Sequence, residues 1–95
     1  MNKEKVYSQI QDYFSDKPVK RVSLFGSFAR DENNDASDID LLITPQQPLG
    51  LFALGRYIAD LEDLIKIKID LTTEGSLSKE FYNGIQKDIK VLYAK

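Results

Sequence analysis

GSFARDENNDASDIDLLI, residues 26–43, determines how the rest of this sequence is interpreted. Before it, Val19 to Phe25 is a short β-rich run that meets Gly26-Ser27, which indicates a strand ending in a turn. Residues 29–37 are polar and rich in turn formers, and they predict a loop, or one helical turn followed by a loop. In residues 37–44, aliphatic residues alternate with Asp38 and Asp40 and predict a second strand.

The flanking segments predict helices and at least one more strand. Apolar residues recur at helical spacing within residues 1–16 and again over 51–65, and the strict alternation of KIKIDLTT predicts a strand over 66–73. Ser78 could begin a helix that runs to about Lys87, and residues 89–93 either extend it or form a fourth strand. We therefore expect a single α/β or α+β domain over residues 1–95, with a small mixed sheet and helices packed on one face.

The composition excludes several kinds of chemistry. Among the 95 residues there is neither cysteine nor histidine, so disulfides, thiolate nucleophiles, imidazole bases and Cys or His zinc sites are impossible. With 13 basic and 15 acidic side chains the formal charge is −2 and no basic face stands out, so no nucleic-acid partner is expected. No apolar run is long enough for a membrane span or a signal peptide, and the cytoplasm is the default location.

Gly26-Ser27 is the first candidate site. Glycine permits a positive φ and close backbone approach, and successive N–H groups in such a turn form a concavity that binds anions. A helical turn beginning at Phe28 would add a favourable dipole for phosphate. The pair alone is weak evidence, because Gly-Ser after a strand is most often only a turn.

Asp38 and Asp40 are the second candidate. In a strand, residues i and i+2 point to the same face with Cα atoms roughly 6.5–7 Å apart, so the two carboxylates would project together. Magnesium would turn their repulsion into coordination, since it prefers hard oxygen ligands. The alternative is a solvated strand face with basic neighbours, and for an isolated Asp-x-Asp the two interpretations are about equal.

Asp70 is the third candidate, on the polar face of the predicted strand 66–73. Alternation alone predicts a polar residue at this position. If its strand lies beside the strand with Asp38 and Asp40, the three carboxylates meet in one patch. Three acids around two metal ions are suited to nucleotidyl or phosphoryl transfer, which needs no histidine.

Taken together, these residues resemble the polymerase-β-like nucleotidyltransferase superfamily. Gly26-Ser27, ten intervening residues, Asp38-x-Asp40 and a later strand aspartate follow its pattern, and residues 26–43 resemble its minimal nucleotidyltransferase (MNT) branch. The resemblance implies a palm-like fold in which Gly26 and Ser27 hold the β and γ phosphates of a nucleoside triphosphate. Asp38, Asp40 and Asp70 would ligate two magnesium ions, and Asp70 would also activate the acceptor hydroxyl.

Two neighbouring positions bear on this resemblance. Arg30 matches the family and could pair with a carboxylate or lean toward the phosphates, although a surface arginine in a charged loop is at least as common. The family usually has glycine after Ala-Arg, whereas this chain has Asp31.

The resemblance also implies a partner. Small MNT proteins pair with HEPN-domain proteins as antitoxin and toxin, and transfer AMP from ATP to a tyrosine of the HEPN ribonuclease. The first hypothesis is thus a magnesium-dependent protein adenylyltransferase and antitoxin. A non-catalytic binding module that keeps the fold is the alternative. Transfer to a small molecule or an RNA end is less favoured, because a second domain and a basic face are missing.

The aromatic residues are interpreted mainly as core. We expect six of them to pack inside, and only Phe28, which follows the Gly-Ser turn, is a candidate for lining a nucleotide pocket. The six expected in the core are Tyr13, Phe14, Phe25, Phe52, Tyr57 and Phe81.

Overall fold

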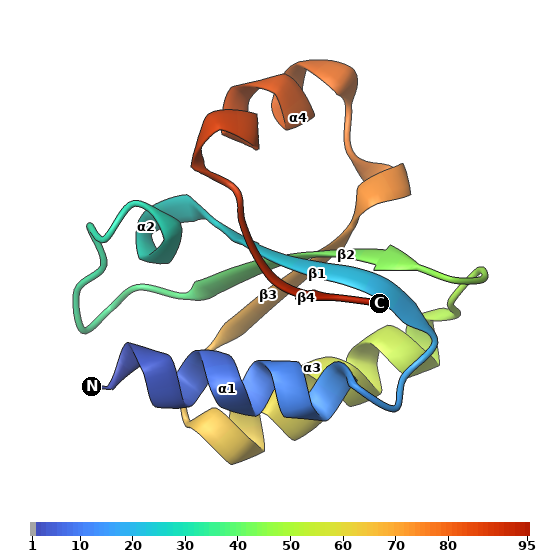
Figure 1. The fold of residues 1–95 in the computed structure, drawn as a ribbon, viewed down its shortest axis with the longest axis horizontal. Coiled ribbons are helices and arrows are strands. Elements are labelled where there is room, and N and C mark those ends of the chain that lie inside the picture. Colours follow the sequence, from blue (N-terminus) through green and yellow to red (C-terminus); the bar gives the residue numbers. More distant parts are fainter. Residues whose placement is uncertain (1) are drawn as a thin grey trace.

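Helices and strands alternate along the chain in the computed structural model, which describes residues 2–95 (Figure 1). The elements are α1 (Lys3–Phe14), β1 (Val19–Phe25), α2 (Gly26–Ala29), β2 (Ile39–Pro45), α3 (Leu51–Ile65), β3 (Ile69–Thr73), α4 (Lys79–Ile85) and β4 (Lys90–Ala94). Two 3₁₀ turns, Glu74–Ser76 and Gln86–Asp88, flank α4. Within the described residues, none of the helices combines the length and apolar character needed to cross a membrane.

The four strands form one mixed sheet in the order β3-β2-β1-β4. β1 pairs antiparallel with β2 and with β4, whereas β3 pairs parallel to β2. A parallel pair needs a crossover connection, and α3 supplies it. The predicted mixed sheet is therefore confirmed, and residues 90–94 form a fourth strand rather than a helical extension.

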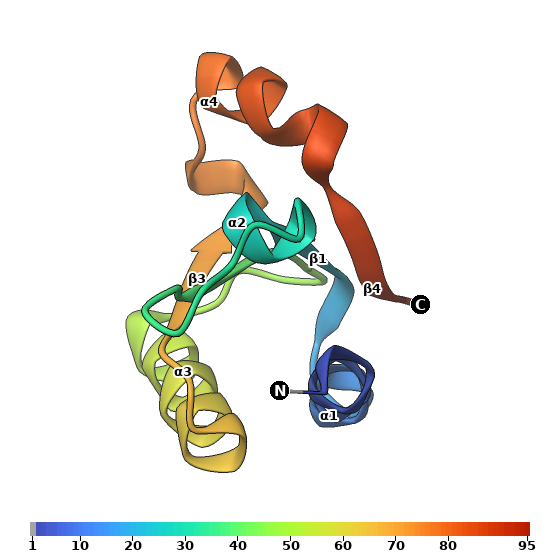
Figure 2. The same cartoon turned by 90° about the vertical axis from the view of Figure 1, so that its left-hand side faces the viewer.

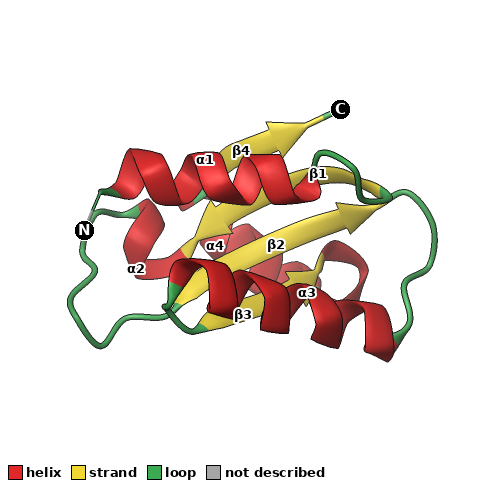
Figure 3. Cartoon of the chain, turned by 90° about the horizontal axis from the view of Figure 1, so that it is seen from below, coloured by secondary structure: helices red, strands yellow, loops and turns green. Residues whose placement is uncertain are grey.

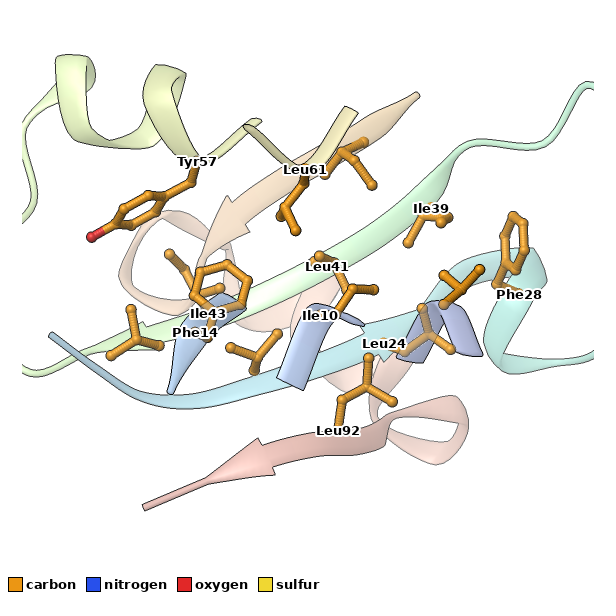
Figure 4. Packing of buried hydrophobic residues seen from close by; sticks show 14 residues of the cluster. Ile10, Phe14, Leu24, Phe28, Ile39, Leu41, Ile43, Tyr57, Leu61 and Leu92 are labelled. Carbon is orange, nitrogen blue, oxygen red and sulfur yellow. The ribbon is translucent and has the colours of Figure 1, made fainter. Parts of the chain in front are cut away.

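The two long helices, α1 and α3, lie on the same side of the sheet, as predicted, while the short α4 lies on the other side (Figures 1, 2 and 3). Between the long helices and the sheet is the hydrophobic core (Figure 4). Its fully buried side chains include Ile10 and Phe14 from α1, Leu61 from α3, Val22 and Leu24 from β1, and Ile39, Leu41 and Ile43 from β2. The opposite face of the sheet carries both polar and apolar residues, among them Asp40 and the buried Phe25.

Local signals explain the boundaries of the helices. The Asn2 side chain accepts a hydrogen bond from the Lys5 N–H and caps α1, and the Ser78 hydroxyl caps α4 by accepting from the Phe81 N–H. At the end of α3, Lys66 takes a left-handed backbone (φ +66°), and its N–H donates to the carbonyl of Glu62. Because residues 66–68 close this helix, β3 begins at Ile69, three residues later than the alternation predicts.

Three aromatic residues differ from the prediction. Phe28 is 1% exposed and belongs to the hydrophobic core, so it does not line an open pocket. Phe52 is 97% exposed, because it lies in the first turn of α3 outside the stripe that packs on the sheet. Phe81 is half exposed on α4, which lies on the other side of the sheet from the core.

Candidate active site

Gly26 brings the backbone of the Gly-Ser turn directly against Asp40. The turn follows β1 and forms the start of α2, and Gly26 has a φ of +73°, a conformation that residues with a side chain rarely adopt. A Cβ at this position would overlap the Asp40 carboxylate oxygen Oδ2. Glycine is therefore required here by both backbone conformation and space.

Asp40 and Asp70 lie side by side on adjacent strands. They are register partners in the parallel β2–β3 pair, and Phe25 is the register partner of Asp40 across the antiparallel β1–β2 pair. The sequence neighbours Ile39 and Leu41 point into the core, so Asp40 points to the opposite face of the sheet. The structure thus joins Asp40, Asp70 and the Gly26-Ser27 turn in one region of that face.

Asp38 lies just before β2 and is turned partly toward a basic residue. Its carboxylate is 4.0 Å from the Lys68 ammonium in an ion pair that is largely open to solvent. Within residues 2–95, no three or more Asp and Glu side chains converge closely enough to form a ready-made metal cluster. Asp40 and Asp70 are therefore brought together, while Asp38 borders them without completing a set of three.

The Asp40 carboxyl carries the clearest electrostatic signal of this region. Partial burial, together with repulsion from Asp70 and Asp38, raises the pKa of Asp40 to about 6, against an ordinary value of 3.8. Attraction from Arg30 acts in the opposite direction and does not cancel these effects. Perturbation by burial and like charges is typical of sites that bind cations or perform acid–base chemistry.

Arg30 is held by two carboxylates at the end of α2. Its Nε is 3.1 Å from Glu32 Oε1, and its Nη1 is 3.9 Å from Asp88 Oδ2 in the turn that precedes β4. Of the roles considered for Arg30, the structure shows carboxylate pairing. Neither Asp88 nor Lys68 was singled out from the sequence, although the alternation of KIKID does place Lys68 and Asp70 on one face.

Asp31 occupies the position where the MNT pattern usually has glycine, and the backbone explains that preference. Its φ is +56°, in the left-handed region where glycine is favoured and where aspartate and asparagine are the best tolerated alternatives. The Asp31 carboxylate is 2.6 Å from the Lys3 ammonium, which itself lies 5.6 Å from the centre of the Phe28 ring. Asp31 therefore replaces glycine while tying the end of α2 to α1.

We expect Asp31→Gly to leave the free energy of unfolding close to that of the wild type. Glycine relieves the left-handed conformation, and the exposed ion pair with Lys3 that is lost contributes little to stability. Asp31→Ala loses the pair without this relief and should be clearly less stable than Asp31→Gly. Urea unfolding of both variants tests this order, and equal stabilities would contradict it.

A comparison with protein families agrees with the arrangement of these residues. The family model for the nucleotidyltransferase domain matches residues 7–92. The chain belongs to this nucleotidyltransferase family. The match spans Gly26-Ser27 and all three aspartates, so the region described above occupies the part of the fold that the family shares.

Individual relatives are consistent with the minimal branch. One relative is a protein of Methanocaldococcus jannaschii whose name assigns it, by inference, as a protein adenylyltransferase. It is 39% identical to this chain over 72 residues, which cover 75% of this chain and 74% of the relative. A solved structure described as a minimal nucleotidyltransferase has a TM-score of 0.82 and 25% identity, with 95% of each chain covered.

A second solved structure comes from a complex of Shewanella oneidensis. It is described as a tri-AMPylated HEPN toxin with its MNT antitoxin, and it is similar to this chain with a TM-score of 0.79 and 19% identity. The similarity covers 99% of this chain and 74% of that one. At this level of identity the likeness shows a shared fold, in agreement with the palm-like α/β domain that the sequence predicts.

Proposed function

We propose that this nucleotidyltransferase, with magnesium, transfers AMP from ATP to a hydroxyl of a partner protein and releases pyrophosphate, as the antitoxin of a HEPN/MNT pair. The observation that carries the proposal is the register of Asp40 with Asp70, which places two carboxylates beside the Gly26-Ser27 turn. Support for the acceptor comes from the relatives, one named a protein adenylyltransferase and another described in complex with an AMPylated HEPN toxin.

The carboxylates fit a divalent cation in their chemistry. Burial, and then the negative charge of Asp70 and Asp38 that Arg30 does not balance, raise the pKa of Asp40, and a hard cation would balance that charge. We propose Asp40 and Asp70 as its main ligands, with Asp38 joining after its exposed ion pair with Lys68 opens. When bound, magnesium would supply charge neutralisation for the phosphates and lower the pKa of the acceptor hydroxyl.

The remaining residues would orient the nucleotide. Backbone N–H groups of Gly26 and Ser27, together with the Ser27 hydroxyl, would hold the β and γ phosphates, because the glycine leaves no side chain between the backbone and Asp40. Asp70 would also accept the proton of the attacking hydroxyl. Arg30 remains a candidate for phosphate binding, provided that the substrate displaces its contacts with Glu32 or Asp88.

A transfer assay with ATP radiolabelled at the α phosphate, magnesium and a co-expressed HEPN protein tests this function. We expect label on the HEPN protein, none when EDTA replaces magnesium, and a large loss with Asp70→Asn. Asp63→Asn is a suitable control, since this exposed carboxylate lies on α3, across the sheet from the site.

A binding measurement separates the enzyme from a non-catalytic module. If the wild-type chain binds the HEPN protein but neither ATP nor an analogue in the presence of magnesium, the enzymatic proposal fails and the module remains. Nucleotide binding that Asp70→Asn abolishes supports the enzyme.

A further inference from the structure

Phe25 and Phe81 form an aromatic pair on the sheet face that carries Asp40. Their ring centres are 6.2 Å apart with an interplanar angle of 88°, an edge-to-face arrangement. Phe25 is the register partner of Asp40, and directly opposed residues of antiparallel strands point to the same face. Consistent with this, Phe25 is buried but lies outside the hydrophobic core under α1 and α3.

Phe81 is the exposed member of this pair. Its side chain remains 49% exposed on α4, which lies over the same side of the sheet in two perpendicular views (Figures 1 and 2). The contact with Phe25 restricts the Phe81 ring, so a planar ligand could stack on it at a low cost in conformational entropy. Stacking of a nucleic-acid base on an aromatic side chain is favourable for every base, because each base has a π face.

The position of this pair beside the Gly26-Ser27 turn indicates which ligand it would bind. Phe25 directly precedes Gly26-Ser27, and Phe81 packs on Phe25, so the aromatic pair lies next to the turn proposed for the triphosphate. The base of a nucleotide is tethered to its phosphates and must lie near the place where they bind. We propose that Phe81, supported by Phe25, binds the base of the nucleotide substrate; this inference rests on the proposed function.

Calorimetry with two ligands isolates the contribution of the base. The ligands are AMP-PNP and inorganic tripolyphosphate, each with magnesium, because the second keeps the phosphates and lacks a nucleoside. We expect Phe81→Ala to weaken AMP-PNP binding about tenfold or more and to leave tripolyphosphate binding unchanged. Phe81→Trp keeps an aromatic surface and should retain affinity, whereas Phe81→Leu keeps apolar bulk and should lose it.

Phe52→Ala is the matched control. Phe52 is the other strongly exposed phenylalanine among residues 2–95, and it lies on α3, across the sheet from Asp40. Its removal should change neither affinity. Thermal unfolding of each variant shows whether the fold is kept.

The outcomes distinguish the two proposals. If the wild type binds neither ligand, the nucleotidyltransferase function proposed above fails, and the assignment of Phe81 fails with it. If the wild type binds AMP-PNP and Phe81→Ala weakens both ligands equally or neither, only the assignment of Phe81 is overturned. An unchanged AMP-PNP affinity with a raised KM for the HEPN protein would show that Phe81 contacts the acceptor instead, which also overturns it.

Discussion

Asp40→Asn should lose transferase activity by roughly a thousandfold and, at neutral pH without magnesium, unfold at a higher temperature than the wild type. Activity falls because the proposed cation loses a central carboxylate ligand. Stability rises because burial and the repulsion from Asp70 and Asp38 make the ionised Asp40 unfavourable, as its raised pKa of about 6 indicates. Solvent still screens this partly buried group, so we expect a gain in the free energy of unfolding of only about 1 kcal/mol at pH 7.5.

The stability gain of Asp40→Asn depends on pH. The folded pKa of Asp40 lies above its ordinary value of 3.8, so the folded wild type binds a proton more readily than the unfolded chain. The penalty is present above pH 6 and disappears as the pH falls toward 4. The advantage of Asp40→Asn should therefore vanish near pH 4 in unfolding experiments with EDTA. Asp35→Asn, on the exposed loop before β2, is the control, and a pH-independent advantage for Asp40→Asn would contradict the explanation.

Gly26→Ala should lose at least about a hundredfold in activity, since a misplacement of about 1 Å costs this much at a reacting centre. The new Cβ overlaps the Asp40 carboxylate, so either Asp40 turns away from Asp70 or the Gly-Ser turn moves. The φ of +73° adds about 1–2 kcal/mol of strain for alanine. Both activity and stability should therefore fall, in contrast to Asp40→Asn.

Gly55→Ala provides the matched control for this glycine. Gly55 lies inside α3, on the other side of the sheet from the site. A Cβ added at this position would have no other atom within 4 Å. Alanine there should stabilise the helix by about 0.5–1 kcal/mol and leave activity unchanged. Transfer assays and urea unfolding of both variants test this prediction. Full activity of Gly26→Ala would show that the close contact between Gly26 and the Asp40 carboxylate is not required.

The sequence predicts β1, β2 and α3 well because each has a strong periodic pattern between clear breaks. Val19–Phe25 ends at Gly26, and the stripe of α3 begins after Pro48. The start of β3 was wrong by three residues, since alternation continues through the turn and cannot show that Lys66 closes the preceding helix.

The candidate site was predictable in part for a similar reason. Alternation over residues 37–44 predicts that Asp38 and Asp40 project together, but β2 begins at Ile39 and Asp38 pairs with Lys68 instead. Pairing between strands decides that Asp70 is beside Asp40. A single sequence without pairing information also cannot show that Lys68 forms an ion pair with Asp38. The exposure of Phe81 escaped prediction because a seven-residue helix gives too short a pattern to separate its buried side from its open one.

The turn between α3 and β3 determines which side chains of the edge strand β3 face the core. Lys66 closes the helix, and the chain reaches Ile69 with Ile69 and Leu71 facing the core and Asp70 facing the other way. Side chains of a strand alternate, so insertion or loss of one residue here would exchange the two faces and point Asp70 into the apolar interior. The length of the turn over residues 66–68 is therefore what keeps Asp70 beside Asp40 and out of the core.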